Sequence, residues 1–171
     1  MTDLIENLTS NRLLPLLLSL GAFALSIMVA IVGYSQLKIA SSKIKLDLYN
    51  KRFHIYETVL DLYQEVYFWE EIKIRRLELE LIKSLRESKY LFDKEDKIYE
   101  TILAIKDANA KNTGFHQQKK ELPHEGNEEV LLLLHKSAVD GRHEFEKHLM
   151  TLEGKLEKYL SFNTINGWSL K

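Results

Sequence analysis

An uncharged stretch near the N-terminus constrains this chain more than any other feature of its sequence. Leu13–Tyr34 is about 22 residues long, contains no charged side chain and lies between Arg12 and Lys38. A helix rises about 1.5 Å per residue, so the stretch extends roughly 33 Å, which is enough to cross a hydrocarbon core of about 30 Å. We therefore predict a transmembrane helix over 12–36, preceded by a short extracytoplasmic N-terminus at 1–11.

Two alternatives exist for this stretch, a cleaved signal peptide and a buried core helix. A signal peptide has an apolar region of about 7–15 residues behind a basic segment, whereas this run is longer and the residues before it include Asp3 and Glu6. A core helix that is apolar on every side needs a larger domain than a chain of 171 residues offers. The membrane span is therefore favoured.

Basic residues flank the predicted span unequally. The N-terminal side offers Arg12 alone, while the C-terminal side offers Lys38, Lys43 and Lys45, followed by further basic residues. Cytoplasmic flanks carry the excess of Lys and Arg, so we expect the C-terminal domain in the cytoplasm and the N-terminus outside. The same three lysines are predicted to contact anionic lipid head groups, each contributing up to about 1 kcal/mol.

Small residues recur along one face of the predicted span at spacings of three and four. They are Ser19, Ala22, Ser26, Ala30 and Gly33. Such a face lets two membrane helices approach closely, so it predicts a packing face for self-association. Gly and other small residues are also common in membrane helices in general, and the alternative that this face has no partner stays open.

The remainder of the chain has the pattern of an all-α domain. Neither Gly nor Pro occurs between Tyr34 and Gly114, and apolar residues recur with the 3.6-residue period of amphipathic helices. We predict a cytoplasmic helical domain at 38–163, with helices at about 38–89, 94–112 and 127–161, and a tail at 164–171. The predicted fold is one N-terminal transmembrane helix that continues into an antiparallel helical bundle or coiled-coil hairpin.

The first helix of this domain carries two adjacent stripes that are both expected in the core. One is aliphatic and consists of Ile44, Leu48, Ile55, Val59, Leu62 and Val66. The other is mostly aromatic and consists of Tyr49, Phe53, Tyr56, Leu60, Tyr63 and Tyr67. Together they cover close to half of the helix surface, so more than one partner helix is needed to bury them. The period weakens at Glu70 and Lys73, which indicates a bend or the point where the helix leaves the bundle.

Composition and motifs argue against several classes of function. The chain has no cysteine and a net charge of −1, which excludes thiolate catalysis and offers no basic field for nucleic acid. No phosphate loop or nucleophile motif occurs, so we predict no enzyme, no cofactor and no small-molecule substrate. Asp140, Glu144 and His148 form a ladder at four-residue spacing, but a solvated face with ion pairs explains it better than a metal site.

Three segments resemble a family of small, uncharacterised bacterial single-pass membrane proteins. The first is Lys45–Tyr56, which contains the order aromatic-x-Lys-Arg-aromatic-x-aliphatic-aromatic, and the others are Tyr90–Phe92 and Tyr159–Phe162. The similarity covers roughly residues 45–162. It implies a helical cytoplasmic domain tethered to the inner membrane of a bacterium, and it implies no activity and no site.

Two classes of function remain. The first, which we expect, is a membrane-anchored interaction or scaffold protein whose helical domain binds a cytosolic partner or a second copy of itself. The anchor concentrates the domain in two dimensions, so weak association becomes effective. The second is an oligomerising membrane effector, of the toxin-like or phage-defence kind, that perturbs the bilayer. Only the small-residue face favours it, since a single uncharged span makes a poor polar pore.

Overall fold

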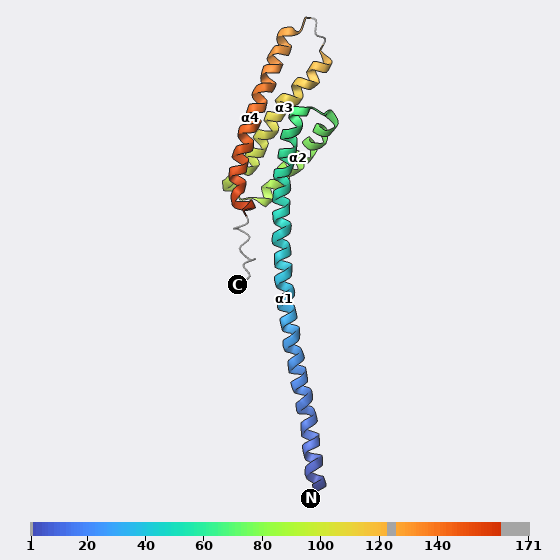
Figure 1. Ribbon diagram of the computed structural model, residues 1–171. Helices are drawn as coiled ribbons and strands as arrows, with labels where there is room; N and C mark the ends of the chain where they lie inside the picture. The colour runs from blue at the N-terminus through green and yellow to red at the C-terminus, as the bar shows by residue number, and fades with distance from the viewer. Residues whose placement is uncertain (1, 123–125, 162–171) are drawn as a thin grey trace. The chain divides into compact units, whose positions relative to one another are not determined.

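The computed structural model describes the backbone of residues 2–122 and 126–161 and the side chains of 15–122 and 126–161. Throughout these residues the protein is all-α, as predicted. Its elements are α1 (Thr2–Phe68), α2 (Glu71–Leu91), the short 3-10 helix η1 (Lys94–Asp96), α3 (Ile98–Glu121) and α4 (Glu128–Leu160), drawn in Figure 1. The chain divides into two compact units, unit 1 at Met1–Lys45 and unit 2 at Leu46–Lys171. The predicted tail at 164–171 lies outside the described residues.

Unit 1 consists of the N-terminal part of α1. Its most apolar window has a mean hydropathy of 2.5 and contains no buried residue, so α1 is long and apolar enough to cross a membrane. The absence of burial in this window separates it from the core helix of a soluble domain. The helix extends beyond the predicted 12–36 in both directions, because residues 2–11 and 37–68 contain neither glycine nor proline to end it.

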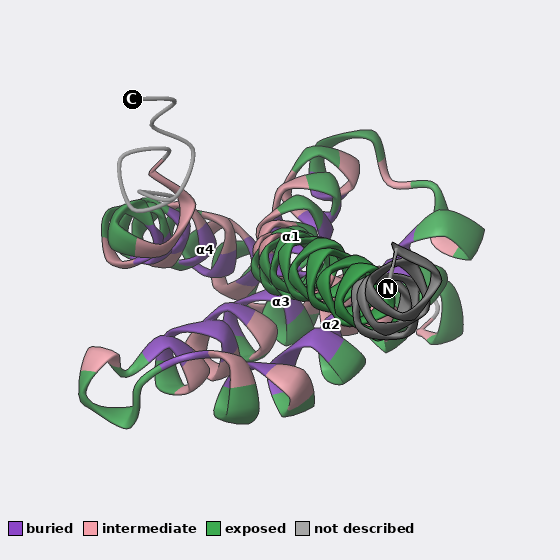
Figure 2. Cartoon of the chain, turned by 90° about the horizontal axis from the view of Figure 1, so that it is seen from below, coloured by how far each residue is buried: buried purple, intermediate pink, exposed green. Residues whose placement is uncertain are grey.

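The core of unit 2 is built around the second part of α1. Ile55, Val59, Leu62 and Val66, from the predicted aliphatic stripe, are at most 4% exposed. The prediction was wrong for the first two residues of that stripe, since Ile44 is 69% exposed and Leu48 is only half-buried. The other helices contribute Ile74, Leu77, Leu81 and Leu85 (α2), Ile98, Ile102 and Ile105 (α3), and Phe145, Leu149, Leu152 and Leu156 (α4). Figure 2 shows these buried faces in purple. Burying one such side chain fully is worth about 1.5–3 kcal/mol, so this shared core holds the four helices together.

The helix predicted at 38–89 is divided in the structure, because the chain reverses at Trp69 and Glu70. Trp69 has a left-handed backbone with φ +50°, and its N–H donates to the Glu65 carbonyl at 2.9 Å. This conformation costs a non-glycine residue about 1–2 kcal/mol, and the reversal offsets the cost by returning the apolar face of α2 to the core. Neither residue is a glycine or a proline. In the sequence the turn is therefore indicated by the weakened hydrophobic period at Glu70 and Lys73.

α3 extends further than the predicted helix at 94–112, and part of its buried face is polar. Asn109 and Asn112 are 3% and 2% exposed. The Asn109 amide donates a 2.7 Å hydrogen bond to a carboxylate oxygen of Glu78 on α2, and the Thr113 hydroxyl donates one of 2.8 Å to the same oxygen. Polar contacts thus replace apolar ones between α2 and α3, and the hydrophobic period fades while the helix continues.

α4 matches the predicted 127–161 to within one residue at each end, and it packs closely on α3. At Gly141 a Cβ atom would lie 2.8 Å from the carbonyl oxygen of Ala108 and 2.9 Å from the Cβ of Lys111. At Gly154, on the same helix, nothing lies within 4 Å of the corresponding position. Glycine weakens a helix interior by about 1 kcal/mol, and at Gly141 the close approach of the two helices explains its presence.

Replacing Gly141 with alanine should therefore destabilise unit 2 by about 1–3 kcal/mol, because α3 and α4 must move apart. Gly154→Ala is the matched control and should stabilise the helix by up to about 1 kcal/mol. Urea unfolding of the full-length chain in detergent micelles, followed by circular dichroism, measures both changes. Equal effects of the two substitutions would contradict the close packing at Gly141.

Candidate functional site

An open groove of about 590 Å³ lies between α1 and α4 in unit 2. It is lined by Tyr56 of α1 and by Met150, Glu153, Gly154, Leu156, Glu157, Leu160 and Ser161 at the end of α4. Most of these side chains are apolar, while Glu153 and Glu157 are exposed carboxylates. Grooves of this kind accept the apolar face of an amphipathic helix. We refer to it as the α1–α4 groove.

The aromatic stripe of α1, expected in the core, borders this groove and is only partly buried. The rings of Tyr49 and Phe53 stack at 6.1 Å with planes 6° apart, and Phe53 lies 6.1 Å from Tyr56. Tyr63 packs on Phe145 at 5.4 Å, whereas Tyr67 remains 54% exposed. The stripe therefore faces the core along one edge and solvent along the other, and it supplies an aromatic surface beside the groove.

The α4 side of the groove is acidic. The Tyr56 hydroxyl donates a 3.1 Å hydrogen bond to Glu153, and burial together with this bond and charge raises the pKa of Tyr56. A 3.1 Å hydrogen bond with Tyr67, followed by burial and by the charges of Tyr67 and Glu146, raises the pKa of Tyr63 to about 12. Both phenols stay neutral at physiological pH. The carboxylates of this wall suit a cationic partner.

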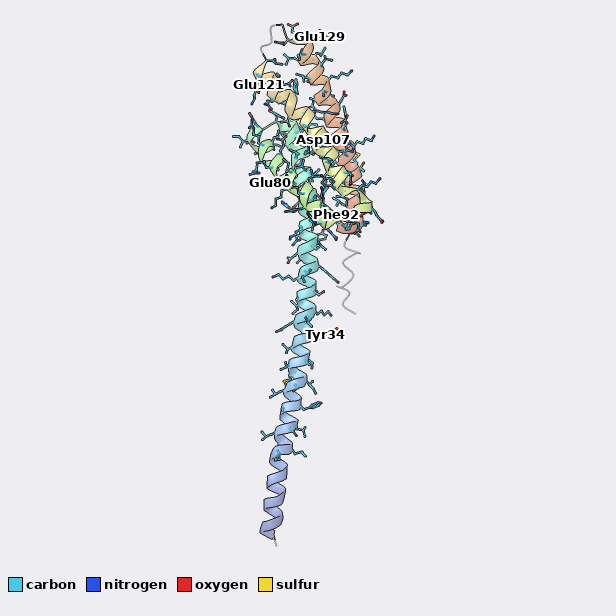
Figure 3. All side chains as sticks on the ribbon, turned by 180° about the vertical axis from the view of Figure 1, so that it is seen from behind. Tyr34, Glu80, Phe92, Asp107, Glu121 and Glu129 are labelled. Carbon is cyan, nitrogen blue, oxygen red and sulfur yellow. The ribbon has the colours of Figure 1, made fainter. Side chains whose placement is uncertain are left out.

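Arg52 joins three helices at the end of unit 2 where α2 and α4 terminate. Its Nε donates a 2.9 Å hydrogen bond to the Leu91 carbonyl at the end of α2. Its guanidinium lies 4.5 Å from the ring centroid of Tyr159 on α4 and 5.7 Å from that of Phe92. Figure 3 labels Phe92 at this end and Glu121 and Glu129 at the opposite end of the unit. Hydrogen bonding and cation–π attraction thus fix α1, α2 and α4 in register.

The segment between α2 and α3 is tied to the same point through Tyr159. Its hydroxyl donates to Asp96, and the Asp93 backbone N–H donates to this hydroxyl at 3.1 Å. Lys158 approaches Asp96 within 2.6 Å, and hydrogen bonds from Lys158 and then Tyr159 lower the pKa of Asp96. Three segments that are far apart in the sequence meet here, through Arg52, through Leu91 and Phe92, and through Tyr159. No local pattern in the sequence predicted this contact.

Arg52→Ala should destabilise unit 2 by about 2 kcal/mol, because it removes a charged hydrogen bond and two cation–π contacts. Lys51→Ala is the control, since Lys51 is exposed on the same turn. Chemical unfolding of the full chain compares them. Arg52→Lys keeps the charge but loses the planar fork, so it should recover only part of the loss. If Arg52→Ala leaves the stability of unit 2 unchanged, Arg52 does not hold the three helices together.

A second hollow of about 400 Å³ lies between the start of α2 and the end of α3. On its border the Trp69 indole stacks on the His116 ring, with centroids 3.4 Å apart and planes 12° apart. Glu71 pairs with Arg75 at 3.0 Å and also with Lys120, so the polar lining is largely satisfied from within. His116, which lies beyond the helix predicted at 94–112, is therefore part of α3 and holds the α1–α2 turn.

Burial, followed by the charges of Lys119, Arg142 and Lys120, lowers the pKa of His116 below its ordinary 6.5. The unfolded chain then binds the proton more readily, so stability should fall as the pH drops below 6.5 and level off below the folded pKa. His116→Phe keeps the stacking on Trp69 and should abolish this dependence of stability on pH. His143→Gln, at an exposed site on α4, should leave it unchanged. Urea unfolding at a series of pH values is the measurement.

The residues predicted for the membrane segment all lie on α1 in unit 1. Ser19, Ala22, Ser26 and Ala30 are exposed and Gly33 is half-buried. The hydroxyls of Ser19 and Ser26 donate to the carbonyls of Leu16 and Ala22, both at 2.8 Å, so neither depends on a second helix. Their role as a packing face stays a prediction.

The predicted lipid contacts and the polar ladder of α4 have separate positions. Lys38, Lys43 and Lys45 are exposed along α1 beyond the uncharged stretch. In unit 2, Glu144 forms an ion pair of 2.6 Å with Lys111 of α3, which is a contact between two helices and not an i,i+4 pair along α4. The contact between the three lysines and lipid head groups stays a prediction.

Comparison with protein families, curated proteins and solved structures finds no match to this chain. The resemblance of its three segments to bacterial single-pass membrane proteins stays a prediction. The class of protein that the structure itself defines is an all-α chain with one long, unburied apolar N-terminal helix and a four-helix unit.

Proposed function

We propose that this protein is a membrane-anchored interaction scaffold, which presents the helical unit 2 to a protein partner or to a second copy of itself. The observation that carries the proposal is the apolar part of α1, long enough to span a bilayer and without any buried residue in its most apolar window. An exposed apolar surface of this size is costly in water and favourable in lipid.

The proposed topology follows from the charges beside the span. Lys38, Lys43 and Lys45 follow the apolar segment, while Arg12 alone precedes it closely. The positive-inside rule then places unit 2 in the cytoplasm and the N-terminus outside the inner membrane. The three lysines would lie near the anionic head groups and add electrostatic attachment.

A scaffold role is supported by what unit 2 offers. Its core is continuous, so the unit is a stable platform. Its surface carries an apolar groove with acidic residues, which suits another helix better than a small molecule. Anchoring in two dimensions raises the effective concentration of such a surface, and modest contacts then suffice for assembly.

The full-length chain should sediment with the membrane fraction of an expressing bacterium and resist extraction at alkaline pH. Replacing Leu25 and Val29 with arginine should release it, because each charge near the span centre costs about 2.5–3.5 kcal/mol. Leu132→Arg and Leu133→Arg, two exposed leucines in unit 2, are the matched control. Recovery of the unaltered chain in the soluble fraction would end the anchor proposal.

Growth of the expressing cells decides between the scaffold and the alternative effector. A scaffold is tolerated, and the membrane potential is unchanged. Growth arrest with loss of potential, abolished by Ala22→Leu and Ser26→Leu, would instead favour an effector that clusters through the small-residue face.

A further inference from the structure

The outer face of α2 is an unpartnered amphipathic surface on the described chain. Ile72, Leu79 and Tyr90 lie along it and are 82%, 69% and 89% exposed. Arg76, Lys83 and Arg86 lie beside them at helical spacing and are also exposed. We refer to these six residues as the α2 strip. A helix face of apolar residues accompanied by cations is typical of a helix that binds an acidic, apolar surface.

The acidic side chains of α2 lie at the margins of this strip. Glu80 is 3.9 Å from Arg76 and Glu87 is 3.8 Å from Lys83. These are exposed pairs one turn apart that contribute little to stability, so they yield readily to a better partner. The strip therefore presents its cations outward.

The α1–α4 groove has the complementary character. Tyr56, Met150 and Leu160 give it apolar contact surface, and Glu153 and Glu157 are acidic. Glu146, whose charge acts on the Tyr63 hydroxyl, continues the acidic wall along α4. Tyrosine faces beside carboxylates attract guanidinium and ammonium groups by cation–π and Coulomb forces together.

The charges of the two surfaces also match in spacing along their helices. On α4, Glu146 and Glu153 are seven residues apart, which is about 10.5 Å along the helix. On α2, Arg76 and Lys83 are also seven residues apart, and Arg86 follows three residues later.

This spacing lets both acidic positions find cations at once. When α2 of one copy lies along α4 of another with Arg86 opposite Glu153, Lys83 lies about 4.5 Å and Arg76 about 15 Å further along α2. Glu146 lies about 10.5 Å further along α4, between these two cations.

We propose that the α1–α4 groove of one copy receives the α2 strip of a second copy. The proposal deepens the proposed function, on which it rests, because a shared membrane supplies the effective concentration that a single helix face needs. The strip and the groove share no residue, so each copy offers both. Such head-to-tail contacts continue into rings or open chains rather than closing as a symmetric pair.

Cross-linking in membranes tests this arrangement on the full-length chain, which has no cysteine of its own. Ile82→Cys lies one turn before Arg86 beside the strip, and Met150→Cys lies about one turn before Glu153 in the groove, so the two cysteines approach each other when Arg86 and Glu153 pair. Two differently tagged variants, one with each cysteine, are co-expressed and treated with a short bismaleimide. Mixed cross-links should form in quantity, while either variant alone should give few.

Charge reversal tests the pairing itself. Glu153→Arg and Arg86→Glu should each reduce the mixed cross-link about fivefold, since an exposed pair contributes up to about 1 kcal/mol. Both reversals in every copy should restore the yield, because the opposite charges then face each other again. Asp140→Arg, on a different face of α4, is the control and should have no effect.

The outcomes separate the two proposals. Absent mixed cross-links from a chain that fractionates with membranes would overturn self-association and leave the anchor intact. Cross-links in each variant alone, equal to the mixture, would show a symmetric contact and also overturn the head-to-tail arrangement. If charge reversal leaves the cross-link yield unchanged, the α2 strip and the α1–α4 groove are not the surfaces in contact. A chain recovered in the soluble fraction would instead refute the anchor.

Discussion

The aliphatic face of α1 is the element on which the rest of unit 2 depends. Ile55, Val59 and Leu62 have no exposed surface, and α2, α3 and α4 all contribute to the core that contains them. A single helix can hold this place because its apolar surface is wider than one neighbour can cover. Earlier in the same helix, the most apolar window contains no buried residue. One continuous α-helix therefore combines an unburied apolar segment with a core-forming segment, and the two differ in side-chain pattern alone.

The surfaces that we propose as functional follow from the same excess of apolar surface. The aromatic stripe beside the core is covered on one edge, and its other edge borders the groove next to α4. On α2 the buried and exposed faces are both partly apolar, and the exposed one carries cations. Apolar surface left uncovered within one chain is the usual mark of an interface. The acidic and basic side chains beside each apolar surface then determine which surfaces fit each other.

Polar contacts decide how the helices are aligned. Arg52 fixes the end of α2 against α1 and α4, and Glu78 receives hydrogen bonds from Asn109 and Thr113 of α3. Apolar packing tolerates sliding of one helix along another, whereas a buried hydrogen bond is lost when its partners shift by an ångström. Gly141 adds a steric constraint of the same kind between α3 and α4. Together these contacts give the bundle one register.

The sequence by itself determined the all-α class, the apolar helix of membrane-spanning length and the aliphatic core residues of α1 from Ile55 onward, because composition and periodicity are local properties of a helix. It also placed α4 within a residue at each end. It did not show that the stripe leaves the core before Ile55, at Ile44 and Leu48. Only the tertiary structure decided the reversal at Trp69, where a left-handed residue that is not a glycine is held by packing across the turn. The same holds for the meeting of Arg52 with Phe92 and Tyr159, and for the half-exposed aromatic stripe. Each of these features depends on which helix, distant in the sequence, packs opposite. The hydrophobic period of a single helix does not show which helix that is.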